Sequence, residues 1–459
     1  MSCVLRVSLG CWSPNAVATK LMSGENAAII GAFIAGTAER TLPENVRDAA
    51  HRSLVDWMGV TVSGAQEQVA QAVLRYSGGE KIPTLGGGDP EKAALANGTA
   101  AHALDFDDTH ILTDSHLSAV IWAALLALAK PETEAGTRLI RAFVAGYEVA
   151  AKLAGRRVGF SMQFRWFHPS GVLGHLASAA AVAAYEGLDA TRAAQALALA
   201  ATQAAGLRGT LGSMAKPVQV GRAAMNGIVS VRMAQAGIVT GLDILDCNGS
   251  FVRAFVQDGS AQLVSLRTDD LGSDWAVLRA SFKPYACLHG IHPSIDAARE
   301  FVTDPEDIVA VRVYVAPGVK QVAKFSMPET PLQAKFSVEY CVALALTGYE
   351  VGAADFSATR LSDPRVRRLM ELVETLPEEG RKMLDSAVEV NLIDGACSRR
   401  ETTLSRGHPG NPMSWMELEA KFLSLVEPFL GSRTSPLLVL LRHFELPDAV
   451  RKIQILLEC

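Results

Sequence analysis

The segment 97–110, with the sequence NGTAAHALDFDDTH, carries the densest set of groups that could do chemistry. Three aspartates, beginning with Asp105, fall within residues 105–108 and follow an alanine-rich run that favours a helix. Thr109 follows them directly, and the imidazole of His116 comes shortly after. Burying so much like charge at the end of an apolar helix is costly unless the charges have partners. The segment therefore predicts either a cation site or a catalytic acid/base site.

A second candidate is His168, which lies in the sequence Trp-Phe-His-Pro-Ser-Gly. Proline is favoured in the first turn of a helix, so Pro169 places His168 at the start of the alanine-rich helix that follows. The positive end of the helix dipole lowers the pKa of an imidazole, which suits a neutral general base. A capping or packing role for His168 is the alternative.

Lysines and two further histidines complete the set. Lys216 lies in an apolar, glycine-flanked loop, where a lysine can hold an anion, although a surface position is the alternative. Lys283, His289 and His292 fall close together, and histidines at positions i and i+3 can share a helix face as metal ligands. Each of these residues alone is more often structural. Together, the carboxylates, imidazoles and lysines suit the abstraction of a proton beside a carboxylate.

The composition argues against several classes of protein. The formal charge of −5 shows no basic bias, which argues against nucleic acid as a partner. The longest apolar runs, such as 119–129, are too short to span a bilayer. The seven cysteines are dispersed without a CxxC pair, which predicts reduced thiols in the cytoplasm and no iron–sulfur cluster.

Two kinds of secondary structure must position these groups. A chain of 459 residues predicts two domains. Up to about residue 274, apolar residues recur almost throughout at helical spacing, which predicts helices at 118–130, 137–155, 170–186, 191–205 and 219–236. After about residue 275 the pattern changes, and it predicts strands at 308–315, 387–392 and 400–404 and helices at 335–348 and 364–375.

The chain returns to a helical pattern at about residue 411, where Ser414 and Glu417 form a capping box. We therefore expect a mainly α protein with a large all-helical domain formed by two segments. A smaller α+β lid domain is inserted between them, so that the domains cover 23–274, 275–410 and 411–459. Residues 1–22 are expected to be a disordered leader or to precede a true start at Met22.

From about residue 25 onward, the order of these motifs resembles that of the MmgE/PrpD family. The resemblance is carried by Asn97-Gly98 with the DFDDT block, Phe167-His168-Pro169-Ser170, Lys216-Pro217 with Gly221, Phe282-Lys283-Pro284-Tyr285, Ala334-Lys335-Phe336-Ser337 and Asn411-Pro412. It implies a homodimer and a cofactor-independent site, without a metal, between the helical domain and the lid. The family's active-site roles fall on Asp105, Thr109, His116, His168 and Lys216.

On the lid side, the family varies, so His289 and His292 are both candidates, with Lys283 as a neighbouring carboxylate binder. We expect His168 and His116 to be acid/base partners, and Asp107 and Asp108 to be structural. The expected roles of the other members are to orient a histidine or lysine (Asp105), to donate a hydrogen bond to substrate (Thr109) and to bind a substrate carboxylate (Lys216).

The resemblance implies a lyase, a dehydratase or decarboxylase, acting on a small di- or tricarboxylate such as 2-methylcitrate or cis-aconitate. An epimerase acting on an iminodisuccinate-like acid and a catalytically silent binding homologue are the alternatives. The loop 110–118 differs from that of many relatives in length and has Leu117 where they have proline, so substrate identity does not transfer. A terpenoid synthase binding magnesium would need a second acidic motif, and Asp269-Asp270 lacks the expected companions.

Overall fold

The computed structural model describes residues 24–458 apart from 80, 156–157, 247–248 and 257–270. The expected leader at 1–22 and the acidic pair Asp269-Asp270 lie outside the described residues. In the described part of the chain, every helix is too short or too polar to cross a membrane.

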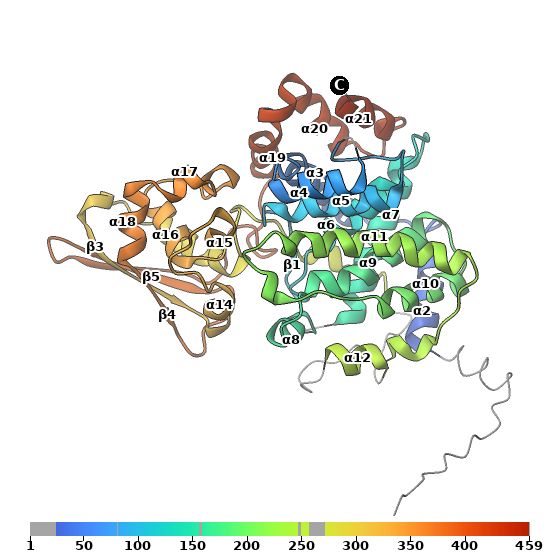
Figure 1. The fold of residues 1–459 in the computed structure, drawn as a ribbon, viewed down its shortest axis with the longest axis horizontal. Coiled ribbons are helices and arrows are strands. Elements are labelled where there is room, and N and C mark those ends of the chain that lie inside the picture. The colour runs from blue at the N-terminus through green and yellow to red at the C-terminus, as the bar shows by residue number, and fades with distance from the viewer. Residues whose placement is uncertain (1–23, 80, 156–157, 247–248, 257–270, 459) are drawn as a thin grey trace, which may run out of the picture.

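Helices form the larger body of the protein, which confirms the mainly α class (Figure 1). The five helices predicted between residues 118 and 236 all form, with ends within four residues of the expected ones. Alanine lets them pack closely, and every residue of α9 is buried. The helices of this part are α2 (Glu25–Ala35), α3 (Glu44–Gly64), α4 (Gln68–Ser77), α5 (Pro90–Ala103), α6 (Leu117–Ala127), α7 (Ala135–Ala154), α8 (Val158–Phe164), α9 (Pro169–Tyr185), α10 (Ala190–Thr202), α11 (Ala215–Gln235) and α12 (Ser250–Phe255).

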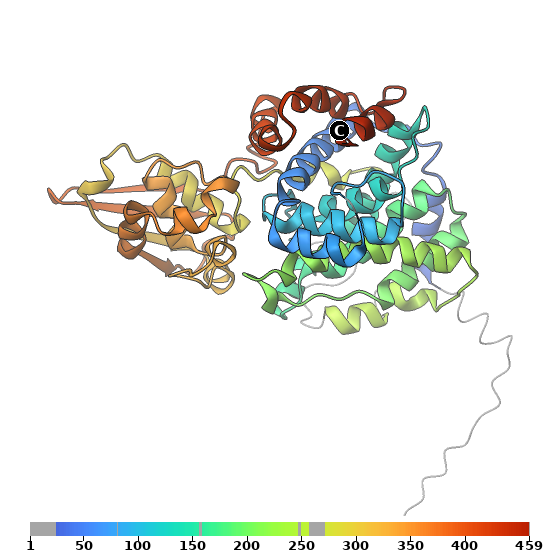
Figure 2. The ribbon, with the colours of Figure 1, turned by 45° about the horizontal axis from the view of Figure 1, so that its top comes forward.

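The C-terminal end of the chain joins the same helical body as α19 (Trp415–Leu430), α20 (Thr434–Arg442) and α21 (Ala449–Glu458). The predicted capping box is confirmed, since the Ser414 hydroxyl accepts the Glu417 N–H and the Glu417 carboxylate accepts the Ser414 N–H. Helix α19 packs against α3, so two helices far apart in the sequence lie side by side (Figures 1 and 2).

A mixed sheet with helices forms a second lobe beside the helical body (Figure 2). Its strands lie in the order β4-β3-β5-β6, with β3 parallel to β4 and antiparallel to β5. The elements are α13 (His292–Arg299), β3 (Ile308–Val315), α14 (Pro317–Val322), α15 (Pro331–Ala334), α16 (Val338–Leu346), α17 (Ala358–Leu361), α18 (Pro364–Leu372), β4 (Val373–Pro377), β5 (Ser386–Leu392) and β6 (Cys397–Thr402).

The strand at 308–315 and the hairpin after it are confirmed, but two predicted boundaries in this lobe are wrong. The helix expected at 364–375 ends at Leu372, because the alternating residues from Val373 onward pair with β3 instead. The last strand occupies 397–402 rather than 400–404, since it pairs with β5 directly after the turn at Gly395.

Three helix ends meet beside this second lobe. Helix α11 packs against both α5 and α9, so the end of α5 and the starts of α9 and α11 lie together. This arrangement brings Asp105, His168 and Lys216 to one place. A two-stranded ladder of β1 (Thr109–His110) and β2 (Ala280–Ser281) then places Lys283 at the same point.

The contact between α5 and α11 depends on glycine. A Cβ atom at Gly221 would lie 2.2 Å from the carbonyl oxygen of Leu95, so the backbones can approach only because position 221 has no side chain. We expect Gly221→Ala to lower the free energy of unfolding by at least ~2 kcal/mol, because overpacking outweighs the ~1 kcal/mol that alanine adds as a helix former.

Thermal and urea unfolding measure this effect, and Gly352→Ala is the control, since a Cβ atom there meets no described atom within 4 Å. Equal stability of the two variants would contradict this account of the packing.

Candidate active site

The segment that follows α5 is held by three lysines. Its successive carbonyl oxygens each accept a hydrogen bond from a different ammonium group. The pairs are Leu104 O with Lys335 Nζ (2.7 Å), Asp105 O with Lys283 Nζ (2.9 Å) and Phe106 O with Lys421 Nζ (2.7 Å). The lysines come from the second lobe, from the chain after β2 and from α19, and all three are buried. They hold Asp105 at a φ of +53°, a left-handed conformation that a non-glycine residue adopts only where its surroundings impose it.

The carboxylate of Asp105 joins two of the cations. Its Oδ1 lies 2.9 Å from Nζ of Lys216 and 2.9 Å from Nζ of Lys283. Burial alone raises the pKa of Asp105, but the two ammonium groups hold that pKa well below its usual value. Burial lowers the pKa of Lys216, although the charge of Asp105 opposes this shift. The result is a buried, ionised carboxylate with an ammonium group on either side.

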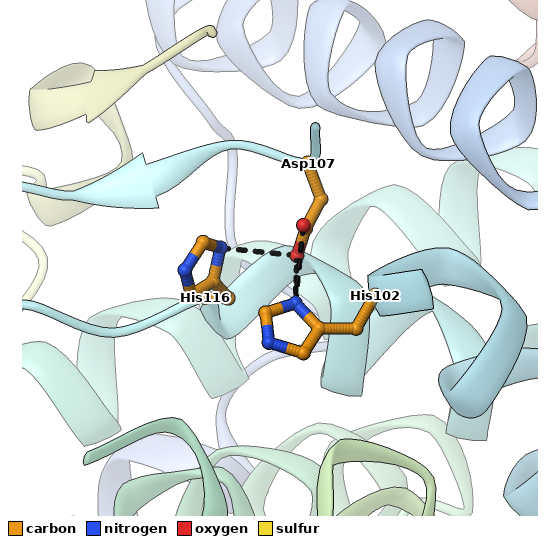
Figure 3. Close-up of side chains that lie close together, drawn as sticks. All are labelled: His102, Asp107 and His116. Carbon is orange, nitrogen blue, oxygen red and sulfur yellow. Dashed lines mark hydrogen bonds and ion pairs between the residues drawn. The ribbon is translucent and has the colours of Figure 1, made fainter. Parts of the chain in front are cut away.

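Asp107 lies between two histidines (Figure 3). Its Oδ2 is 2.9 Å from Nδ1 of His102 and 3.0 Å from Nδ1 of His116. Burial raises the pKa of Asp107, but the two imidazoles more than reverse this and hold the pKa well below its usual value. Burial also lowers the pKa of His102 to about 4. A carboxylate that faces Nδ1 of a neutral imidazole favours the tautomer in which Nε2 is the free acceptor.

The three side chains also form a group that could hold a metal ion, with one ligand atom each within 4.8 Å of the others. The structural role predicted for Asp107 stays a prediction, and its carboxylate orients the rings of His102 and His116. Its neighbour Asp108 accepts a hydrogen bond from Ser118 Oγ (2.5 Å), and burial together with Asp56 raises the pKa of Asp108 well above its usual value.

His168 occupies the N-cap of α9 with Pro169 in the first turn, as predicted. Its Nδ1 lies 3.1 Å from Oε1 of Gln219, so Nδ1 carries the proton and Nε2 is the acceptor. Burial is the main cause that lowers the pKa of His168 well below 6.5, and His102 and Lys216 add to it. The ring is therefore neutral at pH 7, and it stacks on His102 with 5.7 Å between ring centroids. Gln219 was not among the predicted residues.

One cavity, about 490 Å³ including space open to solvent, lies between the helical body and the second lobe. Seven of the eight predicted residues line it: Asp105, Thr109, His116, His168, Lys216, Lys283 and His289. His289 is buried, and burial followed by the charge of Lys283 lowers its pKa to about 3. His292 is not in the lining. Its ring packs 5.0 Å from that of His289, centroid to centroid, and its Nε2 lies 3.3 Å from the carbonyl oxygen of Cys287.

Two charged side chains in the lining were missed by the sequence analysis, namely Asp114 and Arg208. Arg208 donates to the carbonyl oxygens of Gln163 and Gln321, and it thereby connects the helical body to α14 of the second lobe. The different length of the loop after Thr109 was the one signal that pointed toward Asp114.

Family models identify both parts of the chain. The MmgE/PrpD N-terminal domain matches residues 28–263, and the MmgE/PrpD C-terminal domain matches residues 285–441. The chain belongs to the MmgE/PrpD family. This confirms the resemblance inferred from the motifs.

Similar proteins in the same family carry the name cis-aconitate decarboxylase. The mouse protein is 27% identical over 418 residues, covering 85% of this chain and 84% of the relative. The human protein is 28% identical over 410 residues, covering 83% of each chain. A protein of the same name from Aspergillus terreus is 25% identical over 393 residues, covering 77% of this chain and 80% of the relative. The coverage shows that this MmgE/PrpD protein is similar to them across both parts.

The two neighbouring aspartates offer a matched test of this site. Asp107→Asn removes the charge that faces two imidazoles, and we expect it to lower the free energy of unfolding at pH 7 by about 3 kcal/mol. Because the pKa of Asp107 is depressed on folding, its contribution is complete well above pH 3.8 and is lost as the pH falls below that value. Urea unfolding between pH 3 and pH 8 measures it.

Asp108→Asn is the control. Burial and the nearby Asp56 raise the pKa of Asp108, so ionisation of its carboxyl group is disfavoured in the folded protein, and asparagine has nearly the same shape. We expect that variant to retain the stability of the parent protein. A loss as large as that of Asp107→Asn would contradict the charge assignment.

Proposed function

We propose that this protein is a lyase that moves a proton next to a carboxylate of a small di- or tricarboxylic acid, by dehydration or decarboxylation. The cavity is the observation that carries the proposal. It combines a neutral imidazole on His168, ammonium groups on Lys216 and Lys283 and a guanidinium group on Arg208. A neutral base beside several cations is what abstraction of a proton from an anionic acid requires.

In the proposed mechanism, the cations bind the carboxylates of the substrate. Nε2 of His168 takes the proton from the adjacent carbon, and Gln219 keeps the opposite nitrogen protonated. The electron pair left on carbon is delocalised into the carboxylate, where Lys216 and Lys283 stabilise the charge. In dehydration, this electron pair then forms the double bond as hydroxide leaves, and a second acid/base group, for which we propose His116, protonates the hydroxide.

In decarboxylation, the same groups act in a different order. The C–C bond to one carboxylate breaks, carbon dioxide leaves, and the carbanion takes a proton from the imidazolium form of a histidine. Thr109 supports this site, because its Oγ1 is buried at the cavity and has no hydrogen-bond partner among the described residues. It is therefore available to donate to the substrate. The relatives named cis-aconitate decarboxylase support decarboxylation of cis-aconitate as one candidate reaction.

The remaining expectations belong to the same proposal. We propose that residues 275–410 act as a lid domain between 23–274 and 411–459, supported by the bonds from Lys335 and Arg208 across the cavity boundary. Homodimer formation is supported by family membership, and a cytoplasmic location by the dispersed cysteines. Chemistry without a cofactor is supported by the cavity lining, because it already contains a neutral imidazole and the cations that proton abstraction requires.

Turnover tests the proposal directly. The purified protein is incubated with 2-methylcitrate, citrate, cis-aconitate and iminodisuccinate, and products are followed by NMR, with and without EDTA. We expect at least one acid to be converted, and both His168→Gln and Lys216→Met to lower kcat by about 100-fold or more. The iminodisuccinate arm detects the alternative epimerase, which would share the proton abstraction step.

His175→Gln is the matched control, because His175 is a buried histidine on the same helix that lies outside the cavity lining. Turnover that survives both site substitutions would reject the assignment, and no turnover of any acid would favour the silent homologue. Activity that is lost with EDTA and restored by a divalent metal would overturn the cofactor-independent part.

A further inference from the structure

The mechanism leaves the carboxylate of Asp114 without a role, although this side chain lines the cavity. The loop that carries it is closed by hydrogen bonds. The His110 N–H donates to the carbonyl oxygen of Ser115 (2.8 Å), and Oγ1 of Thr113 lies 2.8 Å from His110 Nδ1 and 2.6 Å from Ser115 Oγ. Thr113 and Ser115 are both fully buried. Asp114, between these two anchored neighbours, is the residue that reaches the cavity.

The backbone at Asp114 is strained. Its φ is +48°, in the left-handed region, which non-glycine residues seldom adopt. Helix α8 packs closely against the same loop at Gly159. A Cβ atom at that position would overlap the carbonyl oxygen of Thr113. The surrounding structure therefore imposes this conformation, and its consequence is a carboxylate directed into the site.

This carboxylate has no hydrogen-bond donor of its own among the described residues, whereas Asp105 has two ammonium partners. On one side lies the polar cavity with its cations. Asp114 also lines a second, adjoining cavity, whose apolar lining residues include Ile111, Phe160, Val319 and Met383. Burial raises the pKa of Asp114 to about 7, although Lys283 and Arg208 oppose this shift. Asp114 thus has an unfilled acceptor at the edge of the substrate site.

The charges in the cavity limit how many carboxylates a substrate can carry. Lys216, Lys283 and Arg208 supply three cations, while Asp105 and Asp114 supply two carboxylates when both are ionised. One positive charge is left in excess. A third substrate carboxylate would face Asp114 with unfavourable like charge, whereas a hydroxyl or ammonium group would supply the donor that Asp114 lacks.

We propose that Asp114 is a specificity-determining residue that accepts a hydrogen bond from the substrate, so that the preferred substrate is a dicarboxylate carrying a hydroxyl or ammonium group rather than a tricarboxylate. This inference rests on the proposed function, since it assumes that the cations bind substrate carboxylates.

Binding of small acids tests the inference without requiring turnover. Calorimetry at pH 8.5 compares malate and aspartate, which carry the donor, with succinate, which lacks it, and with tricarballylate, which has a third carboxylate. We expect the wild-type protein to bind malate or aspartate about 10-fold more tightly than succinate, and tricarballylate no more tightly than succinate. In Asp114→Ala we expect the preference for the donor to fall to about 1.

Deleting a negative charge changes the affinity for every anion, so the affinity for malate or aspartate is divided by that for succinate in the same variant. Asp394→Ala removes a carboxylate in an exposed turn and is the control for this general effect of charge. A preference for malate or aspartate that is unchanged in Asp114→Ala would overturn the inference, as would wild-type binding of tricarballylate that is tighter than that of malate. Lys216→Met separates the two proposals. If Lys216→Met leaves succinate binding unchanged, the proposed site itself is wrong. If Lys216→Met weakens succinate binding but Asp114→Ala leaves the preference for malate or aspartate unchanged, the Asp114 inference alone is overturned.

Discussion

Three ammonium groups on three successive backbone carbonyls are the interaction on which the rest of this site depends. The segment that follows α5 is neither helix nor strand, so its carbonyl oxygens need other partners, and Lys335, Lys283 and Lys421 supply them. Each lysine comes from a different segment, so the second lobe, the chain after β2 and the C-terminal helix α19 are all tied to residues 104–106. Burying three cations is costly, and the carboxylates of Asp105 and Asp56 offset part of that cost.

The same constraint organises the acid/base groups. With the carbonyl groups of residues 104–106 fixed by the lysines, Asp105 adopts a left-handed backbone conformation. Its carboxylate then forms ion pairs with Lys216 and Lys283. The chain then returns toward α5, where Asp107 lies between His102 and His116. Burial without a full set of counter-charges keeps His102 and His168 neutral, while Asp105, next to two ammonium groups, stays ionised. The site thus separates neutral bases from fixed charges, as proton transfer beside an anion requires.

Local patterns could be predicted from the sequence, and long-range partners could not. The helix at 170–186, the N-cap at His168 and the strand at 308–315 depend on neighbouring residues, so their spacing was sufficient. Lys335 and Lys421 lie 231 and 315 residues from the carbonyl groups that they contact, and no pattern links them. The pairing of Asp107 with two histidines depends on how the chain turns after α5, and the direction of Asp114 depends on its loop. For the same reason, the sequence pattern predicts a helix up to residue 375, although β4 begins at Val373, since the pairing of β4 with β3 is not local.

The most direct test of the central claim uses Lys421, which lies outside the cavity lining and holds the carbonyl oxygens of Phe106 and Lys283. The double variant Lys421→Met with Asp56→Asn removes the ion pair without leaving an unpaired buried charge. The measurement is kcat/KM on the best-converted acid, normalised to folded protein. If the lysines position the site, a shift of about 1 Å in residues 104–106 lowers kcat/KM by about 100-fold with every cavity residue intact. A kcat/KM within about two-fold of the wild-type value would contradict the account, because it corresponds to a change in activation free energy well under the ~1.4 kcal/mol of a ten-fold effect.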